Sequence, residues 1–314
     1  MVFIALWILL FTTPVWGSVC VVEIVKIHGD TKWFQITKSE GSKLDKFTVT
    51  TFLEPGYKIQ VLQPRPGEDR FEGKLGGEEY SITLLLANGE YKTLKYADTH
   101  GKLYQIECSD TPPPPSVPQN VLDSAQKTFD KLRLKTLSWF ETLIQGKEEK
   151  KEEKTLFMPL FTSAEAKLVS SKTTVYLGWK GGNLPYIVQI FENCKEIVKL
   201  TNIKQRNAEL AGEKFMEGHH YTIVVSETNN PDHKATGTLT VVNKSALPTE
   251  VADIEKSNLL PQSKRTLQAT WLVNRDEKIW SFEAYQQAVE ILRDYPQHYP
   301  AELLKQSLKE EWNK

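Results

Sequence analysis

A run of prolines constrains the fold of this chain more than any other feature. Residues 111–119 read TPPPPSVPQ. Consecutive prolines favour an extended polyproline II segment, which rises about 3 Å per residue and acts as a semi-rigid spacer. The composition changes on either side of the run, which favours a linker over a ligand for an SH3-type domain. The sequence therefore predicts folded units on both sides of residues 111–119.

The length and composition are those of an ordinary globular protein with two or three domains. The chain has 314 residues, of which 40% are hydrophobic and 25% charged, and domains commonly hold about 100–200 residues. The 39 lysines and arginines nearly balance the 40 aspartates and glutamates, which gives a net charge of −1. No basic excess favours nucleic acid as a partner, and no acidic excess favours a charged tail.

The chain begins with a segment typical of export. Residues 1–17, MVFIALWILLFTTPVWG, hold an apolar run that suits a signal peptide and is too short to span a bilayer comfortably. Val15 and Gly17 are small residues at the −3 and −1 positions of a cleavage site before Ser18. No lysine or arginine precedes the apolar run, so an uncleaved anchor is the alternative. We expect export to the periplasm or the extracellular space, with no transmembrane span after the leader.

The three cysteines fit an oxidising compartment. Cys20 and Cys108 lie in the first and last strands expected for the first β domain. Such strands are often neighbours, so a Cys20–Cys108 disulfide is predicted, with two buried free thiols as the alternative. The disulfide would stabilise the fold by on the order of 4 kcal/mol in the chain-entropy model. Cys194 lies in a turn-like stretch, and no histidine is placed to activate it as a nucleophile.

Residues 18–110 are predicted to form a small β domain. Residues 58–62 alternate strictly between polar and apolar side chains. Residues 80–86 and 91–96 also have strand composition, and Asn88-Gly89 lies between them. An Asn-Gly pair flanked by such runs is the strongest short-range signal for a β-hairpin.

Three stretches of this region resemble the exported β domain of FecR-like proteins. Residues 23–30, EIVKIHGD, resemble its opening strand, and residues 54–61, EPGYKIQV, resemble its loop, glycine and entry strand. Residues 82–89, ITLLLANG, resemble its strand followed by a polar-glycine turn. The resemblance covers residues 20–108 and implies an exported β domain. The cytoplasmic segment through which FecR contacts a sigma factor is not expected here, because nothing precedes the leader.

Helical patterns follow the linker and return at the end of the chain. Residues 120–145 carry apolar side chains at three-to-four spacing and predict an amphipathic helix. The run up to residue 154 mixes lysine and glutamate almost evenly, so residues 120–154 are read as a helix and a solvated charged run. Residues 246–314 are predicted to be helical, and we expect all these helices to pack together or to cover one face of the intervening domain. The expected segments are 264–273, 281–292 and 301–312.

Residues 155–245 are predicted to form a second β domain of sandwich type. About seven short strands fall within the 80 residues from 164 to 243, which fits a sandwich. The stretch 217–225 resembles the penultimate strand of immunoglobulin-like and fibronectin type III-like domains. That resemblance implies that the Tyr221 hydroxyl pins a corner and that Trp179 fills the core. The predicted fold class is therefore multidomain and mainly β, with a small N-terminal β domain, a proline-rich linker and an immunoglobulin-like sandwich flanked by α-helices.

No arrangement of residues points to a catalytic site, a metal or a cofactor. His219-His220 is the only histidine pair, and neighbouring residues of a strand face opposite ways, so the two are not expected to share a metal. Zinc-ligand spacings and the nucleophile-elbow motif are absent from the sequence. Carboxylates are plentiful, but nothing selects a pair for glycoside hydrolysis.

Aromatic side chains are the remaining candidates for binding. These rings are expected to be exposed: Trp33 and Phe34 lie beside a polar stretch, and Trp271 and Trp280 lie among the C-terminal helices. Aromatic residues are enriched at protein interfaces and on sugar-binding surfaces. The alternative for the C-terminal group is that it makes a small helical core.

The leading hypothesis is an exported, non-catalytic protein of a bacterial envelope that binds a protein partner or scaffolds an assembly. It depends on the export signal, the two β domains and the missing catalytic motifs. The first alternative is a module that binds cell-wall polysaccharide through Trp33 and its neighbours. The second is an envelope hydrolase whose acidic residues are not recognisable from sequence.

Overall fold

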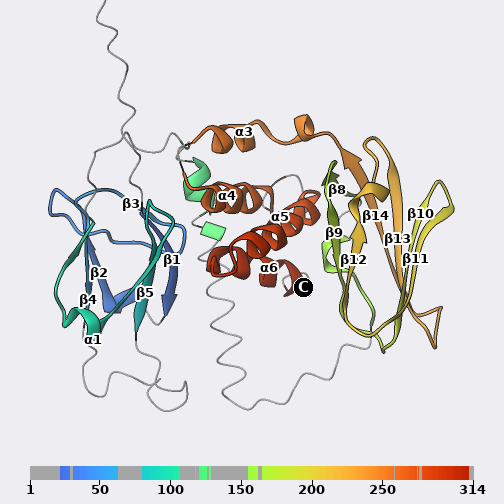
Figure 1. The fold of residues 1–314 in the computed structure, drawn as a ribbon, viewed down its shortest axis with the longest axis horizontal. Helices are drawn as coiled ribbons and strands as arrows, with labels where there is room; N and C mark the ends of the chain where they lie inside the picture. Colours follow the sequence, from blue (N-terminus) through green and yellow to red (C-terminus); the bar gives the residue numbers. More distant parts are fainter. Residues whose placement is uncertain are drawn as a thin grey trace, which may run out of the picture.

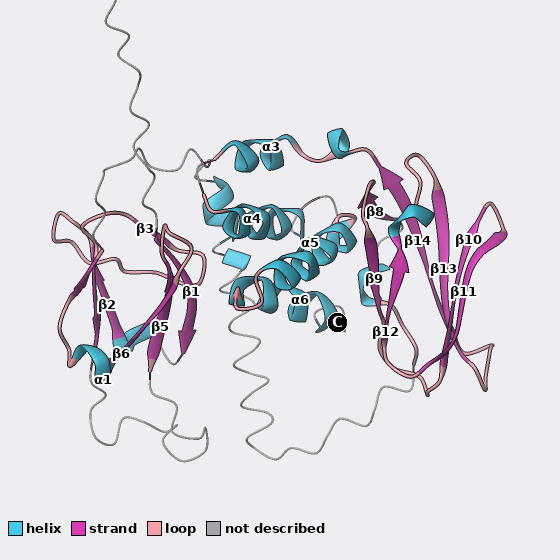
Figure 2. Cartoon of the chain, viewed as in Figure 1, coloured by secondary structure: helices cyan, strands magenta, loops and turns pink. Residues whose placement is uncertain are grey.

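Three layers of secondary structure lie side by side in this protein (Figure 1). Strands form both ends, and a group of helices lies between them (Figure 2). The mainly β, multidomain fold class predicted from the sequence is confirmed. The computed structural model describes residues 22–28, 31–62, 80–106, 117, 120–125, 127–128, 155–161, 165–257, 259–273, 275 and 278–310.

The N-terminal β domain consists of two small sheets that enclose one hydrophobic core. One sheet has the strand order β3-β1-β5-β6 and the other the order β2-β4-β7. Their inward faces bury mainly aliphatic side chains, among them Ile24, Ile36, Ile59, Ile82 and Leu84. The elements are β1 (Val22–His28), η1 (Thr31–Trp33), β2 (Phe34–Thr37), β3 (Phe52–Leu53), β4 (Lys58–Val61), β5 (Ser81–Leu85), β6 (Tyr91–Lys95), α1 (Tyr96–Thr99) and β7 (Tyr104–Gln105).

The hairpin predicted at Asn88-Gly89 is present. β5 and β6 pair antiparallel, with Leu85 opposite Tyr91. The N–H of Leu86 donates to the Glu90 carbonyl at 2.8 Å, and the N–H of Gly89 donates to the Leu86 carbonyl at 2.9 Å. Gly89 has a φ of +85°, a conformation that glycine adopts without steric cost. The asparagine and the glycine therefore fix the turn locally, which explains why the sequence predicts it well.

The second β domain is a sandwich of a five-stranded and a two-stranded sheet. The larger sheet has the order β11-β10-β13-β14-β8, in which β8 runs parallel to β14. The smaller sheet pairs β12 with β9. Buried residues alternate with more exposed ones most clearly in β10, β12 and β14, as expected for a sandwich, whereas β11 has no buried residue. Their bounds are β8 (Ala166–Val169), β9 (Thr174–Gly178), β10 (Tyr186–Glu192), β11 (Lys195–Ile203), β12 (Asn207–Ala211), β13 (His220–Glu227) and β14 (Lys234–Val242).

Cys194 lies in the tight turn that joins β10 to β11. Glu192 and Lys195 pair across this turn, and both residues between them have positive φ, +48° for Asn193 and +65° for Cys194. Such a pair of left-handed residues matches the twist of a two-residue hairpin. Cys194 is an exposed free thiol at a surface turn.

The helices form a bundle that lies against both β domains. α4 packs on α5, and α5 packs on α6, while α3 lies along α4. Residues 120–125 and 127–128 are also helical. The bounds are α3 (Thr249–Lys256), α4 (Pro261–Val273), α5 (Ser281–Asp294) and α6 (Tyr299–Glu310), with short 3-10 turns η2 (Pro159–Phe161), η3 (Gly212–Lys214) and η4 (Lys244–Ala246). The helices do pack together and cover one side of the sandwich, as expected.

One hydrophobic cluster runs without interruption from the sandwich into the helices. Phe161 of η2 lies between them: its ring is 4.9 Å from that of Phe282 on α5. A Cβ at Gly237 of β14 would lie 2.4 Å from the Phe161 ring, so only glycine leaves room for it. Val49 of the N-terminal domain belongs to the same cluster. The helices and the sandwich therefore share a core rather than touching at their surfaces.

Several predictions from the sequence concern residues outside the described ranges. They are the leader 1–17, the Cys20–Cys108 disulfide and most of the linker and charged run, and they stay predictions. Of residues 120–145, only the beginning is described, and it is helical. None of the helices in the described ranges is both long and apolar enough to cross a membrane.

Candidate functional site

A groove of about 570 Å³ opens in the N-terminal β domain. One wall is η1 and β2, and the other is the segment 43–47 that follows them. Its size lies within the range of roughly 300–1,000 Å³ that is usual for binding pockets. The lining residues are Thr31, Lys32, Phe34, Gln35, Ile36, Lys43, Leu44, Asp45, Lys46, Phe47 and Leu62.

The groove exists because the chain leaves the edge of β2 shortly after it has paired with it. Lys43 bridges antiparallel to Thr37. The N–H of Leu44 donates to the Ile36 carbonyl at 2.8 Å, and the N–H of Lys38 donates to the Ser42 carbonyl at 2.8 Å. Beyond Leu44 the ladder stops. Within the described ranges, Phe34 at the start of β2 therefore has no strand beside it on this side.

Two backbone groups of β2 face this groove. In a strand, the N–H and C=O of one residue point to the same side, and successive residues alternate. The backbone groups of Ile36 and Lys38 bond toward residues 42–44. The backbone N–H and C=O of Phe34 therefore point to that side as well. Among the described residues, no hydrogen bond to the carbonyl of Phe34 or from the N–H of Ile36 is formed. Leu44 already lies opposite Ile36, however, so the stretch of this edge without a neighbouring strand is limited to Phe34.

The charged residues that line the groove are mostly lysines. The lining holds three lysines, Lys32, Lys43 and Lys46, and one acid, Asp45. The Lys32 ammonium lies 4.7 Å from the centre of the Trp33 ring. Lys43, Asp45 and Lys46 are exposed. The floor is apolar, because Phe47 is buried in the domain core and Leu44 packs against it. The groove thus combines a hydrophobic floor with a positively charged rim.

The aromatic residues expected to be exposed for binding are buried. Trp33 is 7% exposed and Phe34 4% exposed, and both belong to the core of the N-terminal domain. Trp33 packs on Tyr80 with 5.6 Å between ring centres. The expectation of exposed rings at these positions is wrong, because the two sheets enclose Trp33 and the inward face of β2. Phe34 still borders the groove through part of its surface.

Trp271 and Trp280 are also buried, at 5% and 1% exposure. Both belong to the cluster shared by helices and sandwich, so the alternative of a helical core describes them correctly. Each ring has a cation above it: Arg275 lies 4.2 Å from the centre of the Trp271 ring, and Lys167 lies 5.0 Å from that of Trp280. These rings are placed to stabilise the bundle, not to meet a ligand at its surface.

Trp179 and Tyr221 occupy the structural positions that the sequence predicts. Trp179 is buried and meets the Tyr186 ring edge-on, with 5.4 Å between centres. The Tyr221 hydroxyl accepts a hydrogen bond from the N–H of Met216 at 2.8 Å. This bond ties β13 to the turn before it, which is the corner role that the resemblance implies.

The histidines of the sandwich pair separately with carboxylates. His219 bonds to Glu192, whereas His220 bonds to Glu165 through Nδ1 at 2.9 Å. The prediction that the two neighbours face different ways is confirmed. His233 bonds to the buried Glu227 at 2.7 Å and accepts from the Leu156 N–H at 3.2 Å. No group of three potential metal ligands occurs within the described ranges.

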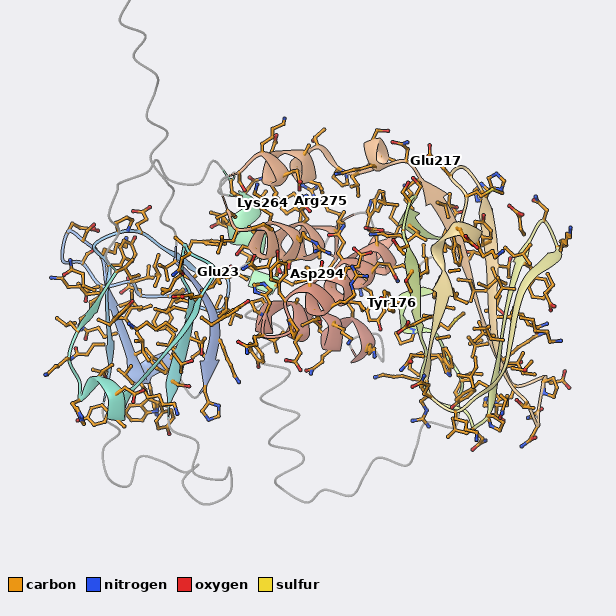
Figure 3. The ribbon with its side chains drawn as sticks, in the orientation of Figure 1. Glu23, Tyr176, Glu217, Lys264, Arg275 and Asp294 are labelled. Atoms are coloured by element: carbon orange, nitrogen blue, oxygen red, sulfur yellow. The ribbon has the colours of Figure 1, made fainter. Side chains whose placement is uncertain are left out.

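A buried polar cluster, missed by the sequence reasoning, joins the N-terminal domain to the helices. Glu23 of β1 is 2% exposed and accepts a hydrogen bond from the Ser263 hydroxyl of α4. Its other oxygen has no partner in the described structure. Burial raises the pKa of Glu23 to about 7, although the Ser263 bond lowers it. Figure 3 shows Glu23 on the side of its domain that faces the helices.

His298 lies in the same interface and is fully buried. Its Nε2 is 2.9 Å from the Thr266 hydroxyl, and its Nδ1 is 3.4 Å from the Tyr91 hydroxyl. Burial lowers the pKa of His298 to about 3, so the ring is neutral at ordinary pH. Burial also raises the pKa of Tyr91 to about 12. The one sequence signal for this cluster is a glutamate inside the apolar run Val22–Val25.

No family model and no curated protein matches this chain. Among solved structures, it is similar to the fibronectin(III)-like modules of CbhA from Clostridium thermocellum. They share 7% identity over 75% of this chain and 94% of the other, with a TM-score of 0.20. It is also similar to the FN1-FN3 domains of chicken CNTN1, with 9% identity over 72% and 66% of the two chains and a TM-score of 0.19. The sandwich assignment rests on the strand order described above.

Proposed function

We propose that this protein is an exported, non-catalytic envelope protein that binds a protein partner through the groove of its N-terminal β domain. The observation that carries the proposal is the groove beside β2, which combines an apolar floor with an excess of lysine over acid in its lining. Strand edges and hydrophobic grooves are common sites of peptide and protein recognition. The FecR-like identity of residues 20–108 and the periplasmic or extracellular location are parts of the same proposal.

The arrangement of the three layers supports a scaffolding role. β1 lies beside the helices, and β2 lies on the side of the domain away from them (Figure 1). A partner at β2 would therefore not meet the helices. The helices in turn share their core with the sandwich. A partner bound at one end would thus be held at a set position relative to the sandwich at the other end.

The two alternatives lack a supporting observation. The aromatic residues chosen for polysaccharide binding, Trp33 and Phe34 among them, are buried. Glycoside hydrolysis needs two carboxyl groups that flank the substrate, and Asp45 is the one acidic residue lining the described groove. Protein binding is therefore the function that we put forward.

The test is capture of a partner from the native envelope with a matched pair of variants. The full-length protein, tagged at the C-terminus, is crosslinked mildly in cells, purified and examined by mass spectrometry. The groove variant is Lys43→Glu with Lys46→Glu. The control is Lys95→Glu with Lys102→Glu, which makes the same charge change at exposed positions outside the groove lining.

We expect one reproducible protein that is captured by the wild type and the control and lost with the groove variant. Capture of wall fragments without protein would contradict the proposal and favour the polysaccharide-binding module. Capture that the groove variant leaves unchanged would move the binding surface away from the groove.

A further inference from the structure

The C-terminal half of α6 brings its lysines to β9 of the sandwich. Lys305 and Lys309 are four residues apart, so they lie on the same side of the helix. A Cβ at Gly178, the last residue of β9, would lie 3.9 Å from Lys309 Cε. Lys180 lies two residues after Gly178 in extended chain that continues the strand pairing, so both point to the same face. Figure 1 shows α6 beside β9, where these lysines meet the sandwich.

Within the described ranges, no acidic side chain pairs with Lys305 or Lys309. Lys309 is half-buried, and burial lowers its pKa. The positive charges of Lys305 and Lys180 lower this pKa further. The acid on the neighbouring strand, Glu209, lies opposite Tyr176 and is exposed. A bound anion would therefore stabilise the charge of Lys309, which the described part of the chain leaves without a counter-charge.

The hydroxyl of Tyr285 on α5 lies at the same place. Tyr285 is 2% exposed, yet its hydroxyl forms no hydrogen bond within the described part of the chain. Its oxygen lies 3.8 Å from the Cβ position of Gly178, and the Lys309 ammonium lies 5.9 Å from the centre of its ring. Burial raises the pKa of Tyr285 to about 12, so the hydroxyl keeps its proton and can donate it. Buried hydroxyls normally have a hydrogen-bond partner.

We infer that Lys305, Lys309 and the Tyr285 hydroxyl bind a phosphate group, with Lys180 adding to the positive field. Two ammonium groups without an acidic partner suit an anion that carries more than one charge. A tetrahedral oxyanion also has enough acceptors for both ammonium groups and the hydroxyl. Gly178 has no side chain to fill the space beside them.

The site is open to solvent and separate from the groove of the N-terminal domain. All three lysines are partly exposed, so a phosphate group can enter. The site lies between the helices and the sandwich, whereas the groove lies in the N-terminal domain. The inference therefore goes beyond the proposed function and does not depend on it.

The first test is isothermal titration calorimetry of the full-length protein with inorganic phosphate, with acetate as the singly charged control. We expect saturable binding of phosphate and none of acetate. Lys309→Met keeps the length of the side chain and removes its charge, so it should weaken phosphate binding by about tenfold or more. Lys256→Met removes the same charge at an exposed position of α3 and should leave binding unchanged.

Stability measurements separate a binding role of these residues from a structural one. Without phosphate, Lys309→Met should be at least as stable as the wild type, because it removes a half-buried charge beside other positive charges. Added phosphate should raise the unfolding temperature of the wild type but not that of Lys309→Met. Tyr285→Phe should weaken phosphate binding by about three- to tenfold.

The phosphate group can be free or can belong to a lipid, and a second arm distinguishes these sources. Vesicles of phosphatidylcholine, with and without phosphatidic acid, are sedimented with the protein. Binding of inorganic phosphate without a preference for phosphatidic acid assigns the site to a free phosphate group. Sedimentation that requires both phosphatidic acid and Lys309 assigns the site to a lipid headgroup.

Absence of binding in both arms would overturn the inference. Binding that Lys309→Met leaves unchanged would overturn it as well. The groove variant, Lys43→Glu with Lys46→Glu, should bind phosphate as the wild type does. Loss of phosphate binding in that variant would place the anion in the groove and overturn the site on α6.

Discussion

The helices meet the two β domains in different ways. At the sandwich, α5 satisfies backbone groups directly: Glu283 accepts from the Val169 N–H at 3.0 Å, and Gln286 bonds to both the N–H and the carbonyl of Tyr176. At the N-terminal domain, the contact combines apolar packing of Val49 with a pair of buried titratable groups, Glu23 and His298. The sandwich interface is therefore completed by hydrogen bonds, whereas the N-terminal interface depends on two side chains staying neutral.

The charge state of the N-terminal interface therefore depends on pH. Glu23 is neutral only below its pKa of about 7, and His298 only above its pKa of about 3. The N-terminal interface is thus fully neutral in the acidic to neutral range and acquires a buried charge above it. A charge buried without a partner is costly. Four variants test this comparison, each at one interface.

The largest effect is expected at the sandwich interface, from Glu283→Ala. Glu283 is 1% exposed and also holds the Lys172 ammonium at 2.9 Å. Its removal leaves the Val169 N–H unsatisfied, takes an acceptor from Gln287 and leaves Lys172 with only its longer ion pair to Glu290 at 3.6 Å. The free energy of unfolding should therefore fall by about 3–5 kcal/mol. Urea denaturation measures it. In a double-mutant cycle, Lys172→Ala combined with Glu283→Ala should cost less than the sum of the two single changes. Simple additivity would refute the pairing.

The next effect is expected at the N-terminal interface, from Glu23→Gln, and it depends on pH. The pKa of Glu23 is raised from 4.5 to about 7 in the folded protein, so the folded state binds the extra proton. Stability should therefore fall as pH rises from 4.5 to 7, and this loss is complete above 7. Glutamine does not titrate. The variant should be more stable than the wild type by up to about 3 kcal/mol at pH 8 and equal to it near pH 4.

The difference in stability between the wild type and Glu23→Gln separates the titration of Glu23 from that of His298. The folded-state pKa of His298 is lowered from 6.5 to about 3, so its contribution is lost as pH falls from 6.5 toward 3, in both proteins alike. Unfolding of wild type and Glu23→Gln across this pH range is the measurement. A difference that is the same at every pH would show that Glu23 is not the titrating group of the interface.

A smaller effect is expected from Gln286→Ala on α5. Its side chain amide accepts from the Tyr176 N–H at 2.8 Å and donates to the Tyr176 carbonyl at 2.9 Å (Figure 3 labels Tyr176). Loss of both bonds should cost about 2 kcal/mol. Amide hydrogen exchange at Tyr176 should become faster, and Gln306→Ala, at an exposed site of α6, is the control. Unchanged exchange at Tyr176 would argue against this contact in solution.

The smallest effect is expected from Tyr91→Phe at the N-terminal interface. The Tyr91 hydroxyl is 3.4 Å from His298 Nδ1, which is long for a hydrogen bond. The expected loss is about 0.5 kcal/mol in the free energy of unfolding. A loss as large as that of Gln286→Ala would remove the distinction drawn between the two interfaces.

The sequence predicts well those parts of the fold that are determined locally. Asn88-Gly89 marks a real turn, and the alternation of residues 58–62 marks a real strand, because both depend on neighbours along the chain. Helix α3 lies in the region predicted to be helical but in none of the three expected segments, because its apolar spacing consists of little more than Val251 and Ile254. A short helix of this kind is stabilised by what it packs on, which the sequence does not display.

The candidate site is not predictable in the same way, because it depends on packing between distant segments. The groove forms where residues after Leu44 leave β2, and no local signal marks that departure. The aromatic residue Trp33 has polar neighbours, which favoured an exposed position, yet the second sheet covers it. Glu23 lies in a strand with four consecutive buried residues, since helix α6 approaches β1 from outside the domain. Alternation of buried and exposed residues along a strand does not predict a buried glutamate at this position.

The contact between Gln286 and Tyr176 also bears on how the edge of β9 is kept from pairing with another chain. A glutamine amide has the donor and acceptor of a peptide group. Gln286 of α5 therefore makes the two hydrogen bonds to Tyr176 of β9 that a neighbouring strand would otherwise make. With the middle of that edge occupied, β9 has no free rung for a strand of another copy. Local unfolding of α5, rather than of the sandwich itself, is then the step that would expose this edge.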